Sequence, residues 1–470
     1  MQKILNLIKK IIPTSVFKFF QPFYHYAMSF LAALFYRFPS EKIIVIGITG
    51  TTGKTTSVYL MAEALKACGL KVGYTSTAMF SDGNKEWLND KKMTMLGLFF
   101  TQKMIAQMVK NGCRYAIIET TSEGIIQFRH RFINYDILVF TGLYPEHIES
   151  HGGFENYKMA KGLLFAHLER CNLKYIDNQK RVLKNIKEVE KIDAKRVAKT
   201  IIANGDDENV EYFLRFWAEK KYKIKMGDFE IKSPDDKLID HKVEEIRIDK
   251  IKLKDNKTYF NIDGIDEFEL SMLGKFNVIN AAFSIVVGYA ENLKIAKIKN
   301  ALKNINSVPG RLERINMGQN FEVIVDYAFE PNALTKLFET LDALNYKKII
   351  HVVGGTGGGR DAARRPILGS ISANEANVTI ITNEDPYDDN PKQIIQEVAI
   401  GAKNAGKKEN KDLFIIEDRR AAIRKALELA SKNDIVIITG KGSEQAICVA
   451  NGQKIPWDDR TVVREEYKKI

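Results

Sequence analysis

A short Gly- and Thr-rich stretch, GITGTTGKTTSVYL at residues 47–60, constrains this chain more than any other feature. It follows the apolar run IIVI at residues 43–46 and opens into a helical pattern. Glycines at a strand-to-helix turn let backbone N–H groups approach phosphate oxygens, and a helix N-terminus favours negative charge. The sequence therefore predicts a loop that binds the phosphates of a nucleotide.

The residues of this loop have distinct expected roles. Lys54 is expected to reach the β- and γ-phosphates of ATP, and the Thr55 hydroxyl to bind Mg²⁺. The strict motif fails at its first position, where Ile48 stands in place of glycine. Because strand, turn and helix occur in order, we still interpret the stretch as an ATP site. The predicted ATP contacts are Gly50, Thr51, Thr52, Gly53, Lys54, Thr55 and Thr56.

Composition narrows the class of protein. The chain has 470 residues, 45% of them hydrophobic, which suggests two to four folded domains. Its net charge is +12, but the lysines are spread along the chain without a basic, aromatic-interleaved stripe, so we expect no nucleic-acid partner. The four cysteines stand far apart, which argues against a zinc ribbon or a disulfide framework and indicates a cytoplasmic protein.

The first 40 residues are treated as a separate helical segment. MQKILNLIKKIIP is basic and apolar, and the apolar run at residues 23–38 is shorter than a membrane span requires. No small-residue cleavage site follows, so a signal peptide is not indicated. Two interpretations stay open for residues 1–38: a helix packed on the main body, which we favour, or a helix in peripheral contact with a membrane surface.

From residue 41 onward, strand-like and helical patterns alternate, which predicts an α/β fold. We expect a central doubly wound parallel-sheet domain with the phosphate-binding loop at residues 41–306. Pro309 and Gly310 mark the boundary to a smaller Rossmann-like α/β domain at residues 307–470. Ligands of such sheets bind beyond the carboxyl ends of the strands.

Two further segments carry chemistry-bearing side chains. Glu119 ends an apolar strand, where a carboxylate can face Mg²⁺ held by the loop. The stretch 141–165 contains His147 and His151 around an acidic loop, followed by Lys161 in a helical pattern. Taken singly, each of these residues is more often structural than functional.

Eight motifs occur in an order that resembles the Mur ligase family, most closely its members that add the third residue of the peptidoglycan stem peptide. They span about residues 43–465: GITGTTGKTT, ETTSEGIIQFR, PEHIESHG-x₄-Y-x₂-AK, GKFNVINAAF, VPGRLE, VDYAFEPNAL, GGRDAARRP and GKGSE. The resemblance implies that the γ-phosphate of ATP passes to a substrate carboxylate. An amino-acid amine then attacks the acyl phosphate, giving an amide and inorganic phosphate.

The resemblance also implies roles for individual residues. Two Mg²⁺ ions are expected, one on Glu119 and one on His147, and Lys161 matches a carbamylated lysine of the family. The implied catalytic residues are Lys54, Glu119, His147 and Lys161, with Thr55, Glu119, His147 and Lys161 on metal. Further implied contacts are Asn280, Arg311 and Asp326 with ATP, Ser122, Gln127 and Arg129 with the acceptor, and Arg360, Asp385 and Glu444 with the incoming amino acid.

Three departures from the family leave questions open. Only about 40 residues precede the loop, so the family's N-terminal uridine-nucleotide domain is expected to be missing. The acceptor is then either a UDP-linked muramoyl peptide or a different, for example lipid-linked, carboxylate. Phe329 stands where the family usually has His. Tyr387 replaces an Arg that pairs with diaminopimelate, which leaves the amino acid undetermined.

Other functions compatible with the loop are a polyglutamate-type ligase with a non-muramoyl acceptor, and an ATP-dependent switch or interaction module. A switch needs no amino-acid pocket, so the presence of Arg360 and Glu444 beside His147 and Lys161 favours a ligase. We expect a monomeric protein that acts on small-molecule substrates. Its two domains are expected to close over the site.

Overall fold

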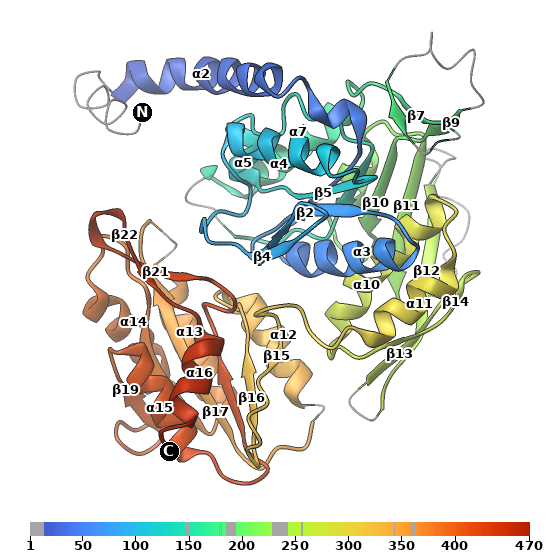
Figure 1. Ribbon diagram of the computed structural model, residues 1–470. Helices are drawn as coiled ribbons and strands as arrows, with labels where there is room; N and C mark the ends of the chain where they lie inside the picture. The colour runs from blue at the N-terminus through green and yellow to red at the C-terminus, as the bar shows by residue number, and fades with distance from the viewer. Residues whose placement is uncertain are drawn as a thin grey trace.

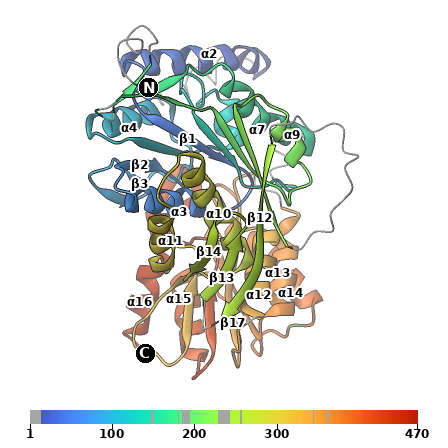
Figure 2. The same ribbon diagram turned by 90° about the vertical axis from the view of Figure 1, so that its right-hand side faces the viewer.

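The computed structural model describes residues 14–146, 151–177, 179, 181–184, 194–227, 243–254, 257–342, 344–359 and 362–470. These residues form two α/β bodies that follow one another in sequence. Helix α2 lies on the outer side of the first body, and the second body lies at the opposite end of the molecule (Figures 1 and 2). The expected α/β class is confirmed.

In the described part of the chain, eleven strands build the sheet of the first body, in the order β14-β13-β12-β11-β10-β6-β1-β5-β2-β3-β4. The middle of the sheet, from β12 to β2, is parallel, and the strands at both edges are antiparallel. The strands are β1 (Ile44–Thr49), β2 (Val72–Thr75), β3 (Met79–Ser81), β4 (Glu86–Leu88), β5 (Tyr115–Glu119), β6 (Ile137–Phe140), β10 (Thr200–Asn204), β11 (Lys220–Met226), β12 (Val243–Lys254), β13 (Lys257–Ile262) and β14 (Asp266–Leu270).

Helices cover both faces of this sheet because its central strands are apolar on both sides. Ile44, Ile46 and Ile48 of β1 enter one core, whereas Val45 enters the opposite core. The first core is covered by α3 (Lys54–Ala67), α10 (Lys275–Ala290) and α11 (Ile295–Asn304); the second by α4 (Leu98–Lys110), α5 (Ser122–Ile126), α7 (Phe154–Leu168) and α9 (Val210–Leu214).

The second body repeats this layering on a smaller scale. Its six described strands run in the order β15-β16-β20-β17-β18-β19 and are parallel except for β15. They are β15 (Glu313–Arg314), β16 (Glu322–Val325), β17 (Ile349–Thr356), β18 (Val378–Asp385), β19 (Leu413–Ile415) and β20 (Ile435–Ile438). One face packs on α12 (Pro331–Asp342), α13 (Arg364–Glu375) and α14 (Pro391–Asn404), the other on α15 (Arg419–Leu429) and α16 (Asp459–Tyr467).

The smaller elements complete the chain. They are the 3₁₀ turns η1 (Pro39–Lys42) and η2 (Ala450–Gly452), the sheet of β7 (Lys174–Ile176), β8 (Val182–Leu183) and β9 (Lys195–Val197), and the hairpin of β21 (Ala446–Val449) and β22 (Gln453–Pro456). The predicted boundary at residue 307 lies between the end of α11 and the start of β15.

Helix α2 (Thr14–Phe35) both packs on the first body and exposes apolar surface. Its C-terminal half rests on the segment after α5: the Ser29 hydroxyl donates to the carbonyl oxygen of Phe128 at 2.7 Å, and the rings of Tyr26 and Phe30 contact Phe132. Its N-terminal half extends past the body (Figure 1). No helix in the described part of the chain combines the length and hydrophobicity needed to cross a bilayer.

Candidate functional site

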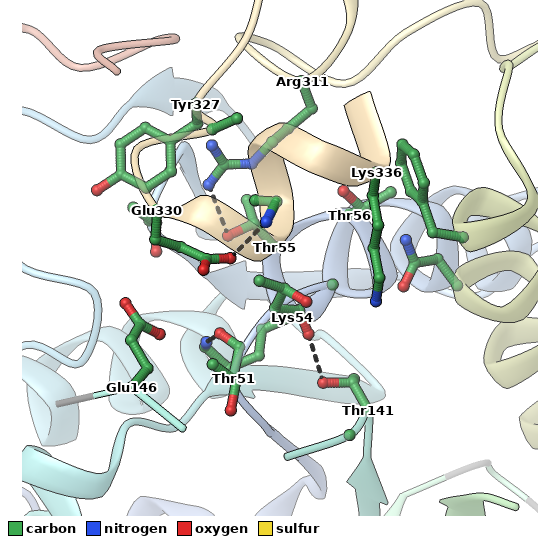
Figure 3. A pocket seen from close by; sticks show the side chains of 18 of the residues that line it. Thr51, Lys54, Thr55, Thr56, Thr141, Glu146, Arg311, Tyr327, Glu330 and Lys336 are labelled. Carbon is green, nitrogen blue, oxygen red and sulfur yellow. Dashed lines mark hydrogen bonds between the residues drawn. The ribbon is translucent and has the colours of Figure 1, made fainter. Parts of the chain in front are cut away.

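The predicted phosphate-binding loop joins β1 to α3. Gly53 precedes the helix with φ 80°, a left-handed conformation that glycine adopts without strain. At Gly50, a Cβ atom would lie 2.0 Å from the Thr141 hydroxyl oxygen, so no other residue fits there. Lys54 folds back and donates to the carbonyl oxygens of Gly50 and Thr51 at 3.1 and 2.7 Å (Figure 3). The backbone thus has the form that the sequence predicts for a phosphate cradle.

Glu119 lies directly beside this loop because β5 and β1 pair in parallel, with Glu119 opposite Ile48. Its carboxylate is buried and accepts hydrogen bonds from the Thr55 hydroxyl at 3.0 and 3.1 Å. The backbone N–H and hydroxyl of Thr77 donate to it at 2.8 and 2.9 Å. A carboxylate and a hydroxyl at the end of a phosphate cradle are hard oxygen donors, which fit Mg²⁺ bound partly by phosphates.

Lys161 approaches the same loop from α7. Its ammonium donates to the Gly50 carbonyl oxygen at 2.8 Å and lies 4.5 Å from the centre of the Tyr157 ring. Burial, and after it the charge of Lys54, lowers the pKa of Lys161 well below its usual value. An amine with a lowered pKa is more often unprotonated at neutral pH and therefore more reactive.

The second body contributes Arg311 and Asp326 to this site. The Arg311 guanidinium stacks 4.0 Å above the Tyr327 ring and donates to the Thr55 hydroxyl oxygen at 3.3 Å (Figure 3). Asp326 accepts from the backbone N–H of Leu312 at 2.7 Å and so supports the turn that carries Arg311. Burial raises the pKa of Asp326.

Asn280 of α10 lies against the loop rather than apart from it. Its side-chain oxygen accepts from the Ser57 hydroxyl at 3.2 Å and would lie 2.5 Å from a Cβ at Gly53. A cavity of about 1220 Å³ opens between the two bodies at this point. The predicted residues among its lining are Thr51, Thr52, Gly53, Lys54, Thr55, Thr56, Glu119, Ser122, Gln127, Arg129, Asn280, Arg311 and Asp326.

The three predicted acceptor residues lie on and just after α5. The Ser122 hydroxyl is 3.1 Å from Nε2 of His151. Arg129 donates to the Gln127 side-chain oxygen at 2.5 Å, and also to the carbonyl oxygen of Met95. Burial lowers the pKa of Arg129, which remains a cation facing the cavity. This arrangement offers a cationic and polar surface to an anionic substrate.

Asp385 and Glu444, predicted to contact an amino acid, lie together in the second body. Lys441 joins them, with its ammonium 2.8 Å from an Asp385 oxygen and 2.7 Å from a Glu444 oxygen. They line a small cavity that shares Thr77 and Tyr327 with the large one. Tyr387 and Phe329, the two departures from the family pattern, line this small cavity as well.

Two predicted residues, His147 and Arg360, lie outside the described residues. Several others that line the cavities were missed by sequence reasoning. Thr77 and Lys92 carried no recognisable signal, because they are single polar residues in short loops. Lys441, which pairs with Asp385 and Glu444, stood inside the motif GKGSE but was not singled out. Glu146 and Glu330 stood inside the motifs PEHIESHG and VDYAFEPNAL, but nothing distinguished them from surface carboxylates.

Fold and site together are typical of an enzyme with a phosphate-binding loop at a cavity between two α/β bodies. Two family models match the chain: the Mur ligase middle domain at residues 48–199, and the Mur ligase, glutamate ligase domain at residues 310–442. The chain therefore belongs to the Mur ligase family, whose members are ATP- and Mg²⁺-dependent amide ligases.

Relatives of known name agree with this assignment. The UDP-N-acetylmuramyl-tripeptide synthetase of Roseiflexus sp. (strain RS-1) is 32% identical over 449 residues, which cover 94% of this chain and 82% of the relative. That of Borreliella burgdorferi is 34% identical over 443 residues, covering 93% and 79%. A UDP-N-acetylmuramoyl-L-alanyl-D-glutamate–2,6-diaminopimelate ligase of Clostridium acetobutylicum is 30% identical, covering 94% and 82%.

Solved structures share the fold. A pseudomurein peptide ligase type C from Methanothermus fervidus superposes with a TM-score of 0.57 at 19% identity, covering 91% of this chain and 79% of that one. A folylpolyglutamate synthase from Mycobacterium tuberculosis gives 0.62 at 14% identity, covering 89% and 92%. The resemblance that the eight motifs indicated is confirmed.

Proposed function

We propose that this protein uses ATP to join an amino acid to the carboxylate of a muramoyl peptide. The observation that supports this most directly is the meeting of two sites: the phosphate cradle with Glu119 on one body, and the acidic pocket of Asp385 and Glu444 on the other. Lys92 and Thr77 line both cavities, so the two sites adjoin. A switch that only hydrolyses ATP has no use for the second site.

In the proposed reaction, an acceptor carboxylate oxygen attacks the γ-phosphorus, and ADP leaves as the bond to the β–γ bridging oxygen breaks. The amino-acid nitrogen then attacks the acyl carbon, loses its proton and displaces inorganic phosphate. Lys54 and Arg311 are placed to neutralise charge on the transferring phosphoryl group, and Arg129 to hold an acceptor anion. Bound Mg²⁺ supplies charge neutralisation at the phosphates, with Thr55 and Glu119 as its protein ligands.

We further propose that Lys161 is carbamylated. Its unprotonated Nζ attacks CO₂, forming an N–C bond while one C–O π bond opens and a proton is released, so that a neutral amine becomes an anion. Burial with a lowered pKa favours this reaction. The resulting carbamate and His147 would be the protein ligands of a second Mg²⁺ ion.

The reaction is tested by measuring phosphate release with MgATP, UDP-N-acetylmuramoyl-L-alanyl-D-glutamate and a panel of amino acids. Release that requires both the acceptor and one amino acid supports the proposal and identifies the third residue. Release that depends on neither contradicts it and favours a switch. If ATP binds but this acceptor gives no release, a different carboxylate is the acceptor.

Helix α2 supports a proposal about location. Among the described residues, Phe19, Phe20 and Phe23 on its projecting half are 59–67% exposed, and the helix contains no acidic residue. Lys3, Lys9 and Lys10 precede it in sequence. An aromatic surface preceded in sequence by cations fits the interface of an anionic membrane. We therefore propose that α2 contacts a membrane surface, and we further propose that the protein is a cytoplasmic monomer.

Vesicle sedimentation tests this placement. Vesicles containing phosphatidylglycerol should retain the protein, whereas pure phosphatidylcholine vesicles should retain it weakly, and Phe20→Ser with Phe23→Ser should reduce retention. Equal retention of wild type and variant contradicts the placement, and light scattering of the free protein checks the monomer.

A further inference from the structure

Lys92 crosses from the first body into the acidic pocket of the second. It belongs to the loop between β4 and α4, yet its ammonium lies 2.7 Å from an Asp385 oxygen and 2.6 Å from a Glu444 oxygen. A third hydrogen bond goes to the carbonyl oxygen of Ala446 at 3.0 Å. Three acceptors thus surround this ammonium, which is the full complement that an alkylammonium group can use.

The contact is buried and is prepared by the backbone. Only 4% of the Lys92 side chain is exposed, against 45% for its neighbour Lys91. Lys92 has φ 54°, a left-handed conformation that is unfavourable for a lysine and persists only where the surroundings enforce it. Asn89 provides part of this support, because its side chain donates to the Met93 carbonyl oxygen at 3.1 Å.

Among the four groups joined by these ion pairs, the charges balance only when Lys92 is present. Asp385 and Glu444 carry two negative charges, and Lys441 and Lys92 supply two positive ones. Burial opposes the charged form of Lys92, but Glu444 and Asp385 raise its pKa well above the usual value, so it stays an ammonium. Without Lys92, the pocket of the second body would hold one uncompensated negative charge in a buried place, which is costly unless a cation replaces it.

The cation that the proposed reaction brings to this pocket is an amino acid, which carries an ammonium group. We propose that Lys92 is an internal stand-in for the ammonium of the incoming amino acid: it fills the Asp385–Glu444 site in the ligand-free enzyme, holds the two bodies together, and is displaced when the amino acid binds. The part of this inference in which Lys92 competes with the amino acid rests on the proposed function. The part in which Lys92 holds the two bodies together, here called the latch, rests on the contacts alone.

This arrangement affects specificity, because the ammonium group of an incoming amino acid competes with the covalently tethered ammonium of Lys92. A tethered group competes at a high effective concentration, so an amino acid succeeds only if its remaining contacts add enough affinity. Lys92 would therefore raise the concentration of amino acid needed to occupy the Asp385–Glu444 site. It would exclude small amines, whose only contact there is an ammonium group.

Lys92→Met tests both halves, with Lys91→Met as the matched control and Lys92→Arg as the variant that keeps the charge. Small-angle X-ray scattering of the ligand-free proteins tests the latch: Lys92→Met should have a larger radius of gyration than Lys91→Met and wild type. Equal radii for all three proteins would overturn the latch, whether or not any ligase activity is found.

Phosphate release with L-lysine, meso-diaminopimelate and L-alanine tests the competition. Lys92→Met should lower the KM for the accepted amino acid about 10-fold, with the KM for ATP unchanged, and methylammonium should inhibit this variant more strongly than wild type. A raised KM would overturn the stand-in and make Lys92 a binding residue. If release is found but depends on no amino acid, the proposed function fails, while the scattering result still decides the latch.

Discussion

The guanidinium of Arg311 donates a hydrogen bond to the hydroxyl oxygen of Thr55, 256 positions earlier in the chain and on the other body of the protein. The same hydroxyl donates to Glu119. One threonine oxygen thus connects the cradle, the strand-end carboxylate and the C-terminal domain. A ligand that changes the position of Thr55 therefore changes the contacts of the cradle, of Glu119 and of the C-terminal domain.

Replacing Arg311 by alanine removes this connection and a cation from the phosphate site. Hydrogen bonds to charged groups contribute about 1.5–3 kcal/mol, so we expect kcat/KM for ATP to fall about 10- to 100-fold. Arg314→Ala is the control, since Arg314 is 39% exposed and pairs with Glu322. Equal steady-state rates for Arg311→Ala and the control would show that Arg311 does not act on the nucleotide.

Replacing Lys161 by alanine should lower the ligation rate about 10²-fold or more, because an anion expected at the active site is lost. Formate or acetate should restore part of the rate. Lys158→Ala is the control, one turn earlier on the same helix and paired with Glu155. In ¹³C NMR with labelled bicarbonate, wild type but not Lys161→Ala should show a carbamate signal. Absence of that signal in wild type would exclude carbamylation.

Glu119→Gln retains the shape of the side chain and removes its charge. The amide oxygen can still accept from the Thr77 N–H, so the fold should be kept. We expect the Mg²⁺ concentration for half-maximal rate to rise about 10-fold, while binding of ATP without Mg²⁺ is unchanged or slightly tighter. Glu155→Gln, at an exposed position, is the control. An unchanged Mg²⁺ requirement would remove Glu119 from the metal site.

The raised pKa of Glu384 implies that the free energy of unfolding depends on pH. Burial, reinforced by Asp385, raises its pKa from 4.5 to about 7 in the folded protein, against the opposing charges of Arg419, Lys441 and Arg364. The folded state then binds more protons than the unfolded state between these values, so this group makes folding less favourable as pH rises through that window. Glu384→Gln should therefore gain up to about 3 kcal/mol over wild type at pH 8 and nothing at pH 4.5.

Thermal unfolding from pH 4.5 to pH 8 measures this difference. The gap in Tm between Glu384→Gln and wild type should widen with pH and level off above about pH 7. Glu375→Gln on the exposed end of α13 should show no such trend. A gap that is constant across the range would mean that the pKa of Glu384 is not raised in the folded protein.

The sequence predicted best what is local. The cradle follows from glycines, a lysine and a threonine within seven residues, and the apolar runs around it predict the strands and helices that position it. The position of Glu119 could also be predicted, because parallel neighbouring strands end at the same edge of the sheet. Lys92 could not be predicted, since its partners lie 293 and 352 positions away and no local pattern marks it.

Helix α2 shows that composition alone does not predict what an apolar helix packs against. Its apolar character suggested either packing or a membrane surface, and the described half near Ser29 packs while the half near Phe19 and Phe20 is exposed. The packing interpretation holds for the C-terminal half of the helix. Contact of the exposed half with a membrane stays a proposal. Helix α2, Thr14–Phe35, begins before the apolar run at residues 23–38 and contains Pro22.

The ion pairs of the pocket join Asp385, Lys441 and Glu444 of the C-terminal domain to Lys92 of the first body. The first-body segments around Thr77 and at residues 89–94 also line the cavity. Under the proposed function, most of the charged residues that select the amino acid would belong to one folding unit. A chimaera that carries the C-terminal domain of a relative should then inherit the donor's amino acid, provided that Thr77 and the loop at residues 89–94 are exchanged along with it. Diversification of such enzymes would then need a domain replacement and a compensating change in one loop of the first body.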